Sequence, residues 1–187
     1  MKVTIGVSNR HIHLKESDLK VLFGEEYKLE KQKDLTQPGQ FASTAKLTIK
    51  TDKSKIDGVR VLGPVRNYTQ VEISKTDSYK LGINPPVRNS GDLNESATVT
   101  LIGPNGSIEA KESCIIATRH IHLSKEHIIK YNLEGKETVN VKLNGQKGGI
   151  ITNVYLKEAD NSFFEMHLDT DDANAHLIKN GDIGEII

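Results

Sequence analysis

The sequence predicts a mainly β protein built from compact barrels, with two halves related by internal duplication. Three observations support this prediction: many short runs rich in β-forming residues, turn-forming dipeptides between them, and a five-residue motif that occurs twice. Short strands joined by turns, with few helices, are typical of barrels rather than of sheets in which strands and helices alternate.

Eight runs combine β-branched residues with alternating apolar positions, which favours strands. They are Lys2–Ser8, Ala45–Thr51, Lys55–Leu62, Thr69–Ser74, Ala97–Ile102, Glu137–Leu143, Ile150–Lys157 and Phe163–Asp169. The dipeptides typical of turns are Pro38-Gly39, Asp57-Gly58, Asn105-Gly106 and Asn144-Gly145. The segment Gly82–Glu95, which contains two consecutive prolines, is predicted to connect the two halves.

Three short stretches are predicted to be helical. They are Glu16–Phe23, Lys125–Tyr131 and Asp171–Lys179. Ser124 is expected to cap the second helix, and Asp169 or Thr170 the third, because short side-chain oxygens satisfy the free N–H groups of a first helical turn.

The internal repeat is the most informative feature. Arg-His-Ile-His-Leu occurs at Arg10–Leu14 and again at Arg119–Leu123, each time between a predicted strand and a predicted helix. A weaker repeat aligns Val71–Asp77 with Met166–Asp172 and makes Glu72 equivalent to His167. We interpret the two halves as copies of one duplicated unit.

The repeated histidines predict metal binding. Side chains at positions i and i+2 of a strand lie on one face, so each His-x-His pair presents two imidazoles to one point. A single such pair is more often a surface or packing feature, but its duplication favours a metal site. Three protein ligands with an open fourth position are typical of catalytic zinc. The two predicted sets are His11, His13 and Glu72, and His120, His122 and His167.

Composition excludes several classes of function. The 25 basic and 25 acidic residues cancel, so no general field attracts nucleic acid or an anionic membrane. No apolar run approaches the roughly 20 residues needed to span a bilayer, and the first residues do not resemble a signal peptide. The single cysteine, Cys114, excludes an internal disulfide. We therefore expect a cytoplasmic protein without nucleic-acid or membrane partners.

Seven motifs together resemble the PduL-type phosphate acyltransferases, also called phosphate propanoyltransferases or phosphotransacylases. They are Ser8–Leu14, Gln37–Ala42, Leu62–Arg66, Thr69–Glu72, Val87–Asp92, Thr118–Leu123 and Met166–Asp169. The resemblance runs in order from about Ile5 to Ile187. It implies two β-barrels capped by short α-helices: residues 10–117 would form the central barrel, and residues 1–9 with residues 118–187 the second.

The resemblance also implies functional residues. The family's two zinc ions per chain would be held by the six ligands proposed above from spacing, and its phosphate-binding catalytic arginine falls on Arg66. Its coenzyme A contacts fall on Val7, Ser8, Asn9, Lys53, Arg60 and Asn174. The family further suggests a homodimer. Taken alone, Arg66 would be a solvated surface arginine, and Lys53 and Arg60 could be hairpin residues without a ligand.

Two departures from the family pattern are visible. Lys15 replaces the serine that usually follows the first His-Ile-His-Leu, which is expected to weaken the cap of the next helix. The chain shows no N-terminal extension of the kind that sends some relatives into bacterial microcompartments, so a cytosolic role is expected.

The expected reaction is reversible transfer of a short acyl group, acetyl or propanoyl, between coenzyme A and inorganic phosphate at a dinuclear zinc site. One alternative is a dinuclear zinc hydrolase of an ester or phosphoester, since a metal-bound water is a ready nucleophile. Another is a non-enzymatic barrel in which the metals only stabilise the fold.

Overall fold

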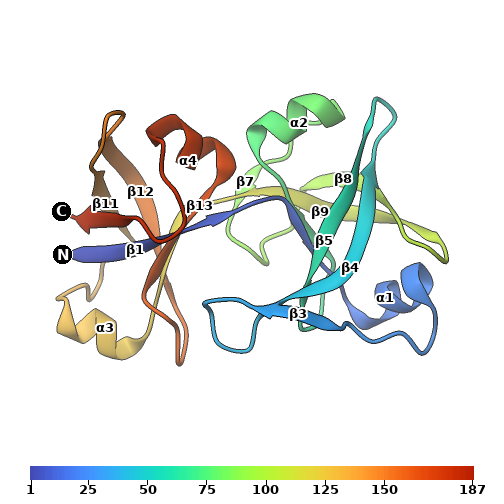
Figure 1. The fold of residues 1–187 in the computed structure, drawn as a ribbon, viewed down its shortest axis with the longest axis horizontal. Coiled ribbons are helices and arrows are strands. Elements are labelled where there is room, and N and C mark those ends of the chain that lie inside the picture. The colour runs from blue at the N-terminus through green and yellow to red at the C-terminus, as the bar shows by residue number, and fades with distance from the viewer. The chain divides into compact units, whose positions relative to one another are not determined.

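The structure, a computed structural model, describes all residues from Met1 to Ile187 and consists of two compact units. Unit 1 comprises Met1–Asn9 and Thr118–Ile187, and unit 2 comprises Arg10–Ala117. Each unit contains a closed barrel of six strands, with short helices outside it (Figure 1). This confirms the predicted mainly β class with two barrels.

Unit 2 closes its barrel in the order β4-β5-β2-β6-β9-β8, with β8 pairing back to β4. Its core contains fully buried aliphatic side chains such as Ile12, Leu47 and Val61, which alternate along their strands with outward-facing residues. Its elements are β2 (His11–His13), α1 (Glu16–Phe23), β3 (Lys31–Asp34), β4 (Phe41–Lys50), β5 (Lys55–Gly63), β6 (Gln70–Glu72), α2 (Lys75–Leu81), β7 (Val87–Arg88), β8 (Ala97–Ile102) and β9 (Ser107–Ala117).

Unit 1 closes in the order β1-β13-β10-β12-β11-β14. Ile5, Ile121 and Met166 are among the fully buried side chains of its separate core. Its elements are β1 (Lys2–Ser8), β10 (His120–Leu123), α3 (Lys125–Lys130), β11 (Thr138–Leu143), β12 (Gly149–Glu158), β13 (Glu165–Asp169), α4 (Thr170–His176) and β14 (Ile183–Ile186).

The two barrels have the same strand topology. In unit 2 the His-x-His strand β2 runs parallel to β5 and antiparallel to β6. In unit 1 the second copy, β10, runs parallel to β12 and antiparallel to β13. The register places His11 opposite Glu72 and His120 opposite His167. Structure and sequence therefore agree that one unit was duplicated.

In both copies of the repeat, the strand that precedes the His-x-His strand belongs to the barrel of the other unit. Strand β1 belongs to unit 1 and pairs in parallel with β13, whereas the strand that follows it, β2, belongs to unit 2. Likewise β9 pairs in parallel with β6 of unit 2, whereas β10 belongs to unit 1. The chain passes between the units after Asn9 and again after Ala117.

The predicted role of Gly82–Glu95 as the connection between halves is wrong. This segment lies inside unit 2, where its short strand β7 pairs with β9. Consecutive prolines and a glycine indicate a loop, but the same signal marks linkers and loops within a domain. The chain passes between the units directly after strands β1 and β9, so no loop-like change in composition marks these positions.

Three of the four helices begin at a residue of a type that commonly caps helices. Ser74 caps α2 by accepting from the backbone N–H of Asp77, and the side chain of Asp169 caps α4 by accepting from the N–H of Asp172. Ser124 is the predicted cap of α3. Lys15 makes no side-chain cap bond at α1, as expected from its replacement of serine. The helix α2 was not predicted from the sequence, and it shortens the expected strand Thr69–Ser74 to β6.

None of the four helices has both the length and the apolar character required to cross a membrane.

Unit 1 should fold from a rearranged chain. Strand β14 is antiparallel to β1, and the amide of Ile186 donates to the carbonyl of Met1 at 2.7 Å, so the two termini lie side by side (Figure 1). We expect residues 118–187, followed by a short glycine linker and residues 1–9, to unfold cooperatively in urea. Residues 118–187 alone should show no such transition, because the barrel loses buried Val3 and Ile5 and exposes two strand edges. Circular dichroism measures both, and a cooperative transition of the fragment alone would contradict the role of β1.

Candidate metal and anion sites

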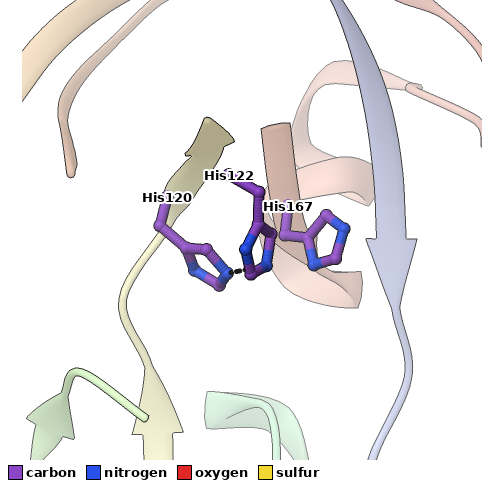
Figure 2. Close-up of side chains that lie close together, drawn as sticks. All are labelled: His120, His122 and His167. Carbon is purple, nitrogen blue, oxygen red and sulfur yellow. Dashed lines mark hydrogen bonds between the residues drawn. The ribbon is translucent and has the colours of Figure 1, made fainter. Parts of the chain in front are cut away.

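The first candidate metal site is a cluster of three histidines in unit 1. His120 and His122 project from one face of β10, and His167 lies opposite His120 on β13 (Figure 2). One possible ligand atom from each residue lies within 4.8 Å of the others. The imidazole nitrogens Nε2 of His120 and His122 face each other at 3.1 Å.

Two of these rings are held by polar atoms outside the cluster. His120 Nδ1 lies 2.8 Å from the carbonyl oxygen of Thr118 and can only donate to it, which leaves Nε2 with its lone pair toward the cluster. His167 Nε2 lies 2.8 Å from the carboxylate oxygen Oε2 of Glu165. Outer hydrogen bonds of this kind are typical of histidines that bind metals.

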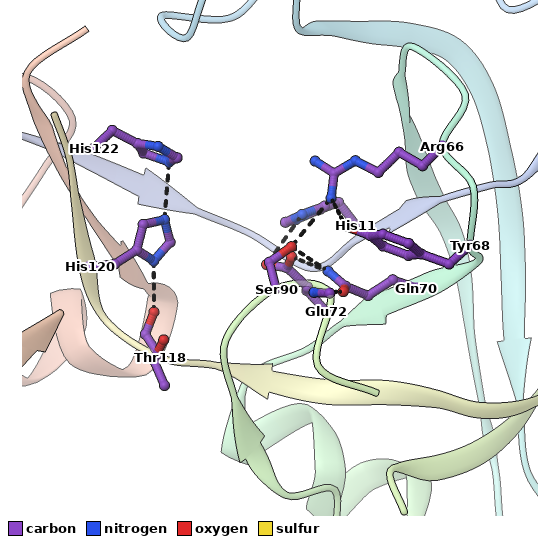
Figure 3. A network of polar contacts seen from close by, with 10 residues as sticks. His11, Arg66, Tyr68, Gln70, Glu72, Ser90, Thr118, His120 and His122 are labelled. Atoms are coloured by element: carbon purple, nitrogen blue, oxygen red, sulfur yellow. Dashed lines mark hydrogen bonds and ion pairs between the residues drawn. The ribbon is translucent and has the colours of Figure 1, made fainter. Parts of the chain in front are cut away.

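The second cluster lies in unit 2 and contains one carboxylate. His11 and His13 project from β2, and Glu72 lies opposite His11 on β6. His11 Nε2 is 3.3 Å from Glu72 Oε2 (Figure 3). His13 is almost fully buried. As in unit 1, the possible ligand atoms all lie within 4.8 Å of one another.

One pair of candidate ligand atoms in each cluster has the spacing that zinc would require, and the remaining candidate atoms lie within 4.8 Å of them. Zinc takes nitrogen and carboxylate ligands at about 2.0–2.2 Å in a tetrahedron, so neighbouring ligand atoms lie roughly 3.3–3.6 Å apart. The observed separations, 3.1 Å between His120 Nε2 and His122 Nε2 and 3.3 Å between His11 Nε2 and Glu72 Oε2, are close to that edge length. With three donors each, both clusters leave one position of a tetrahedron for a substrate atom.

An arginine–aspartate pair stands beside each cluster. Arg10, which precedes His11, donates from Nε to Asp77 Oδ2 at 2.8 Å, and this hydrogen bond raises the pKa of Arg10. Arg119, which precedes the second cluster's first histidine, donates to Asp172 at 3.1 Å. Burial raises the pKa of Asp172, and the guanidinium opposes that rise. Each pair connects a His-x-His strand to the helix that follows the third member of the cluster.

A hydrogen-bonded path connects Arg66 with the cluster of unit 2 (Figure 3). Arg66 Nη1 donates to Tyr68 Oη at 3.1 Å and to Ser90 Oγ at 3.2 Å. Gln70 Nε2 donates to the same Ser90 oxygen at 2.9 Å and to Glu72 Oε1 at 2.6 Å. The predicted phosphate-binding arginine and a predicted metal ligand therefore belong to one polar network.

Arg66 carries a positive charge that no nearby carboxylate neutralises. Its guanidinium is half-buried, forms no ion pair, and contacts the hydroxyls of Tyr68 and Ser90. Ser90 Oγ already accepts two hydrogen bonds, so its own proton is left to be donated elsewhere. A guanidinium fork with remaining donors, next to a hydroxyl donor, suits an anion such as phosphate.

Sequence reasoning did not assign roles to Ser90 and Gln70, although both stand in the matched motifs Val87–Asp92 and Thr69–Glu72. The backbone N–H of Gly91 donates to Gln70 Oε1 at 2.7 Å and so fixes the orientation of the amide group. Gly91 has φ of 97°, a conformation that glycine adopts without strain. The loop that carries Ser90 and Gly91 is distant in sequence from β6, so its contact with Gln70 could not be predicted from the sequence alone.

The residues predicted to contact coenzyme A are divided between the units. Val7 and Ser8 lie on β1 beside Leu168 and Asp169, where α4 begins. Val7 donates its N–H to Asn180 Oδ1 at 2.6 Å. Asn9 is exposed after β1, and Asn174 is exposed on α4.

In unit 2, Lys53 and Arg60 belong to the hairpin of β4 and β5, and Arg60 lies on β5. Lys53 is exposed in the turn between β4 and β5, with Nζ 3.4 Å from the carbonyl of Tyr79. Arg60 lies opposite His11 in the β2–β5 register and donates to Gln32 and to the carbonyl of Ser43. Its guanidinium therefore already has protein partners, whereas Lys53 has one long contact.

Comparison with known proteins gives a consistent family. The family model of phosphate propanoyltransferases matches residues 4–179. Relatives named phosphate propanoyltransferase include those of Rhodopseudomonas palustris, 43% identical over 99% of this chain and 82% of the relative, and of Thermotoga maritima, 45% identical over 99% and 89%. That of Priestia megaterium is 47% identical over 97% of this chain and 84% of the relative. The chain therefore belongs to the phosphate propanoyltransferase family and is an acyltransferase.

Proposed function

We propose that this chain transfers a short acyl group, acetyl or propanoyl, reversibly between coenzyme A and inorganic phosphate, with one zinc ion in each three-residue cluster. The observation that supports this most strongly is the path from Arg66 through Ser90 and Gln70 to Glu72. It joins the proposed phosphate-binding arginine to a proposed metal ligand within one unit. The names of the relatives agree with such a substrate pair.

Arg66 would bind the phosphate that attacks. Phosphate is a weak nucleophile and is repelled by the anionic coenzyme, so a site for it must supply positive charge. The hydroxyls of Tyr68 and Ser90 hold one guanidinium nitrogen in place, and the remaining donors are available for a bidentate contact with phosphate. A guanidinium that is already oriented loses less entropy when the substrate binds.

Bound zinc would supply Lewis-acid charge that polarises the thioester carbonyl and stabilises the oxyanion of the transition state. The residues of the chain would orient the substrates. Phosphate held by Arg66 would attack the carbonyl carbon directly. A carbon–oxygen bond forms, the carbon–sulfur bond breaks, and coenzyme A leaves as the thiolate. The predicted coenzyme A contacts Val7, Ser8, Asn9, Lys53, Arg60 and Asn174 belong to this proposal.

The environment of Cys114 argues against an acyl-enzyme on the only thiol. Cys114 is fully buried on β9, opposite Val71 of β6. Burial raises the pKa of its thiol to about 12, so the nucleophilic thiolate is scarce at neutral pH. Direct attack by phosphate needs no such residue. The homodimer that the resemblance implies and the cytoplasmic location expected from the sequence stay predictions.

Release of free thiol should depend on phosphate and on metal. The zinc-loaded chain, given acetyl-CoA or propanoyl-CoA, should release coenzyme A when phosphate or arsenate is present and should release little without either. Removal of metal with a chelator should abolish the reaction, and zinc should restore it. Thiol release without phosphate would instead identify a hydrolase. A metal-loaded chain that releases no thiol under any of these conditions, and that loses its circular dichroism spectrum on chelation, would indicate metals that only stabilise the fold.

Replacement of Arg66 should impair phosphate binding specifically. Loss of a charge-assisted hydrogen bond costs about 1.5–3 kcal/mol, so Arg66→Ala should lower kcat/KM for phosphate about 10- to 100-fold. Arg66→Lys should recover only part of it, because an ammonium lacks the bidentate fork. The control is Lys50→Ala, which removes an exposed cation of unit 2 outside the network. If Arg66→Ala raised KM for acyl-CoA by a similar factor and left KM for phosphate unchanged, the assignment would be wrong.

The thiol of Cys114 should react with an aromatic disulfide reagent only after unfolding. The native chain should show less than one-tenth of the reactivity seen in guanidinium chloride, and Cys114→Ser should keep phosphate-dependent turnover if the chain stays folded. Rapid labelling of the native chain that also abolishes turnover would argue against direct attack.

A further inference from the structure

A buried polar residue lies two positions before the third member of each cluster. In unit 2 this residue is Gln70, which precedes Glu72 on β6 and is fully buried. In unit 1 it is Glu165, which precedes His167 on β13 and is 4% exposed. Positions i and i+2 share a face of a strand, so each buried residue can reach its neighbour.

In each pair one side chain donates a hydrogen bond and the other accepts it, but the buried residue is the donor in unit 2 and the acceptor in unit 1. Gln70 Nε2 donates to Glu72 Oε1 at 2.6 Å, so an amide N–H meets a carboxylate. Glu165 Oε2 lies 2.8 Å from His167 Nε2, so a carboxylate meets an imidazole nitrogen that can donate. The third member is a carboxylate in unit 2 and an imidazole in unit 1. Its buried neighbour changes accordingly, from the donor Gln70 to the acceptor Glu165.

We propose that Gln70 and Glu165 are positioning residues that orient the third metal ligand of each cluster and select which of its atoms faces the cation. The inference rests on the proposed function, because it takes both clusters as metal sites. A donated Nε2–H at Glu165 leaves Nδ1 of His167 as the ligand atom. A bond from Gln70 to Oε1 leaves Oε2 of Glu72, the oxygen that faces His11 at 3.3 Å.

Gln70 is itself held by a hydrogen bond, whereas Glu165 is confined by its burial. The amide oxygen of Gln70 accepts from the N–H of Gly91 at 2.7 Å, so the amide cannot rotate without losing that bond. Glu165 is opposite His122 in the β10–β13 register and has Gly6 of the neighbouring strand β1 at its side. A buried carboxylate with nothing to pair with would be costly, which favours a defined partner for Glu165.

Gly6 makes room for the pair in unit 1. It lies opposite His167 in the β1–β13 register. A Cβ atom at this position would lie 3.1 Å from Glu165 Cδ and 3.2 Å from His167 Cδ2, closer than ordinary van der Waals contact. Even a methyl group on this strand would therefore push both side chains.

The test uses a parent chain with His11→Ala and His13→Ala, so that only the cluster of unit 1 binds metal. Cobalt titration followed by visible absorbance, with a competing chelator, gives the affinity. Glu165→Ala should weaken it about 10- to 100-fold. Glu165→Gln should weaken it less than about threefold, because its amide oxygen can accept the same hydrogen bond. His167→Ala is the positive control, and Glu185→Gln, an exposed glutamate of β14, is the matched control.

The outcomes separate this inference from the proposed function. If the parent chain binds no cobalt, the proposed metal site fails. If the parent binds and Glu165→Ala binds equally well, only the positioning role fails. If Glu165→Gln is as weak as His167→Ala, Glu165 is a ligand rather than a positioning residue, which also overturns the inference. Circular dichroism of each variant checks that the barrel is intact.

Three further measurements report on the orientation of the third ligands. In the metal-free parent, nitrogen-15 NMR should find the Nε2–H tautomer of neutral His167 dominant, and Glu165→Ala should produce a mixture. Gly6→Ala should weaken cobalt binding about 10-fold while the barrel stays folded, because the methyl group displaces the pair. In the complementary parent, with His120→Ala and His122→Ala, Gln70→Leu should weaken binding about 10-fold. Unchanged tautomers and affinities would contradict the proposal.

Discussion

Both candidate sites depend on the antiparallel pairing of a short His-x-His strand with the strand that carries the third member of the cluster. Strand β2 has three residues, yet its pairing with β6 places His11 directly opposite Glu72, and β10 with β13 does the same for His120 and His167. A slip of one residue would turn every side chain to the opposite face. The closed barrels hold this register, because each short strand has a parallel neighbour on its other edge.

Much of the fold and of the clusters follows from local periodicity. The repeated His-x-His pattern needs only the two-residue repeat of a strand, and the repeat of Val71–Asp77 at Met166–Asp172 supplies the third members. The exchange of first strands between barrels is different: it depends on tertiary closure and leaves no local mark. The resemblance to a family implied it, and composition did not.

The polar surroundings of the sites were harder to predict. Gln70 and Glu165 could be inferred to share a face with Glu72 and His167, but their burial depends on the closure of the barrels. The contact of Ser90 with Arg66 joins a loop to a segment distant in sequence. The helix α2 is short and polar, so its formation depends on the Ser74 cap and on packing more than on intrinsic propensity.

Strand exchange also sets an order of events during synthesis on the ribosome. Strand β1 is synthesised well before its partners β13 and β14, so it can pair only after they emerge. Unit 2 has all its strands once Ala117 has been translated, and its cluster can then form, whereas the three-histidine cluster must wait for β13 and for the closing strand β14. Until then β1 is an unpaired strand with buried-type residues such as Val3 and Ile5, a nascent segment that chaperones would be expected to protect.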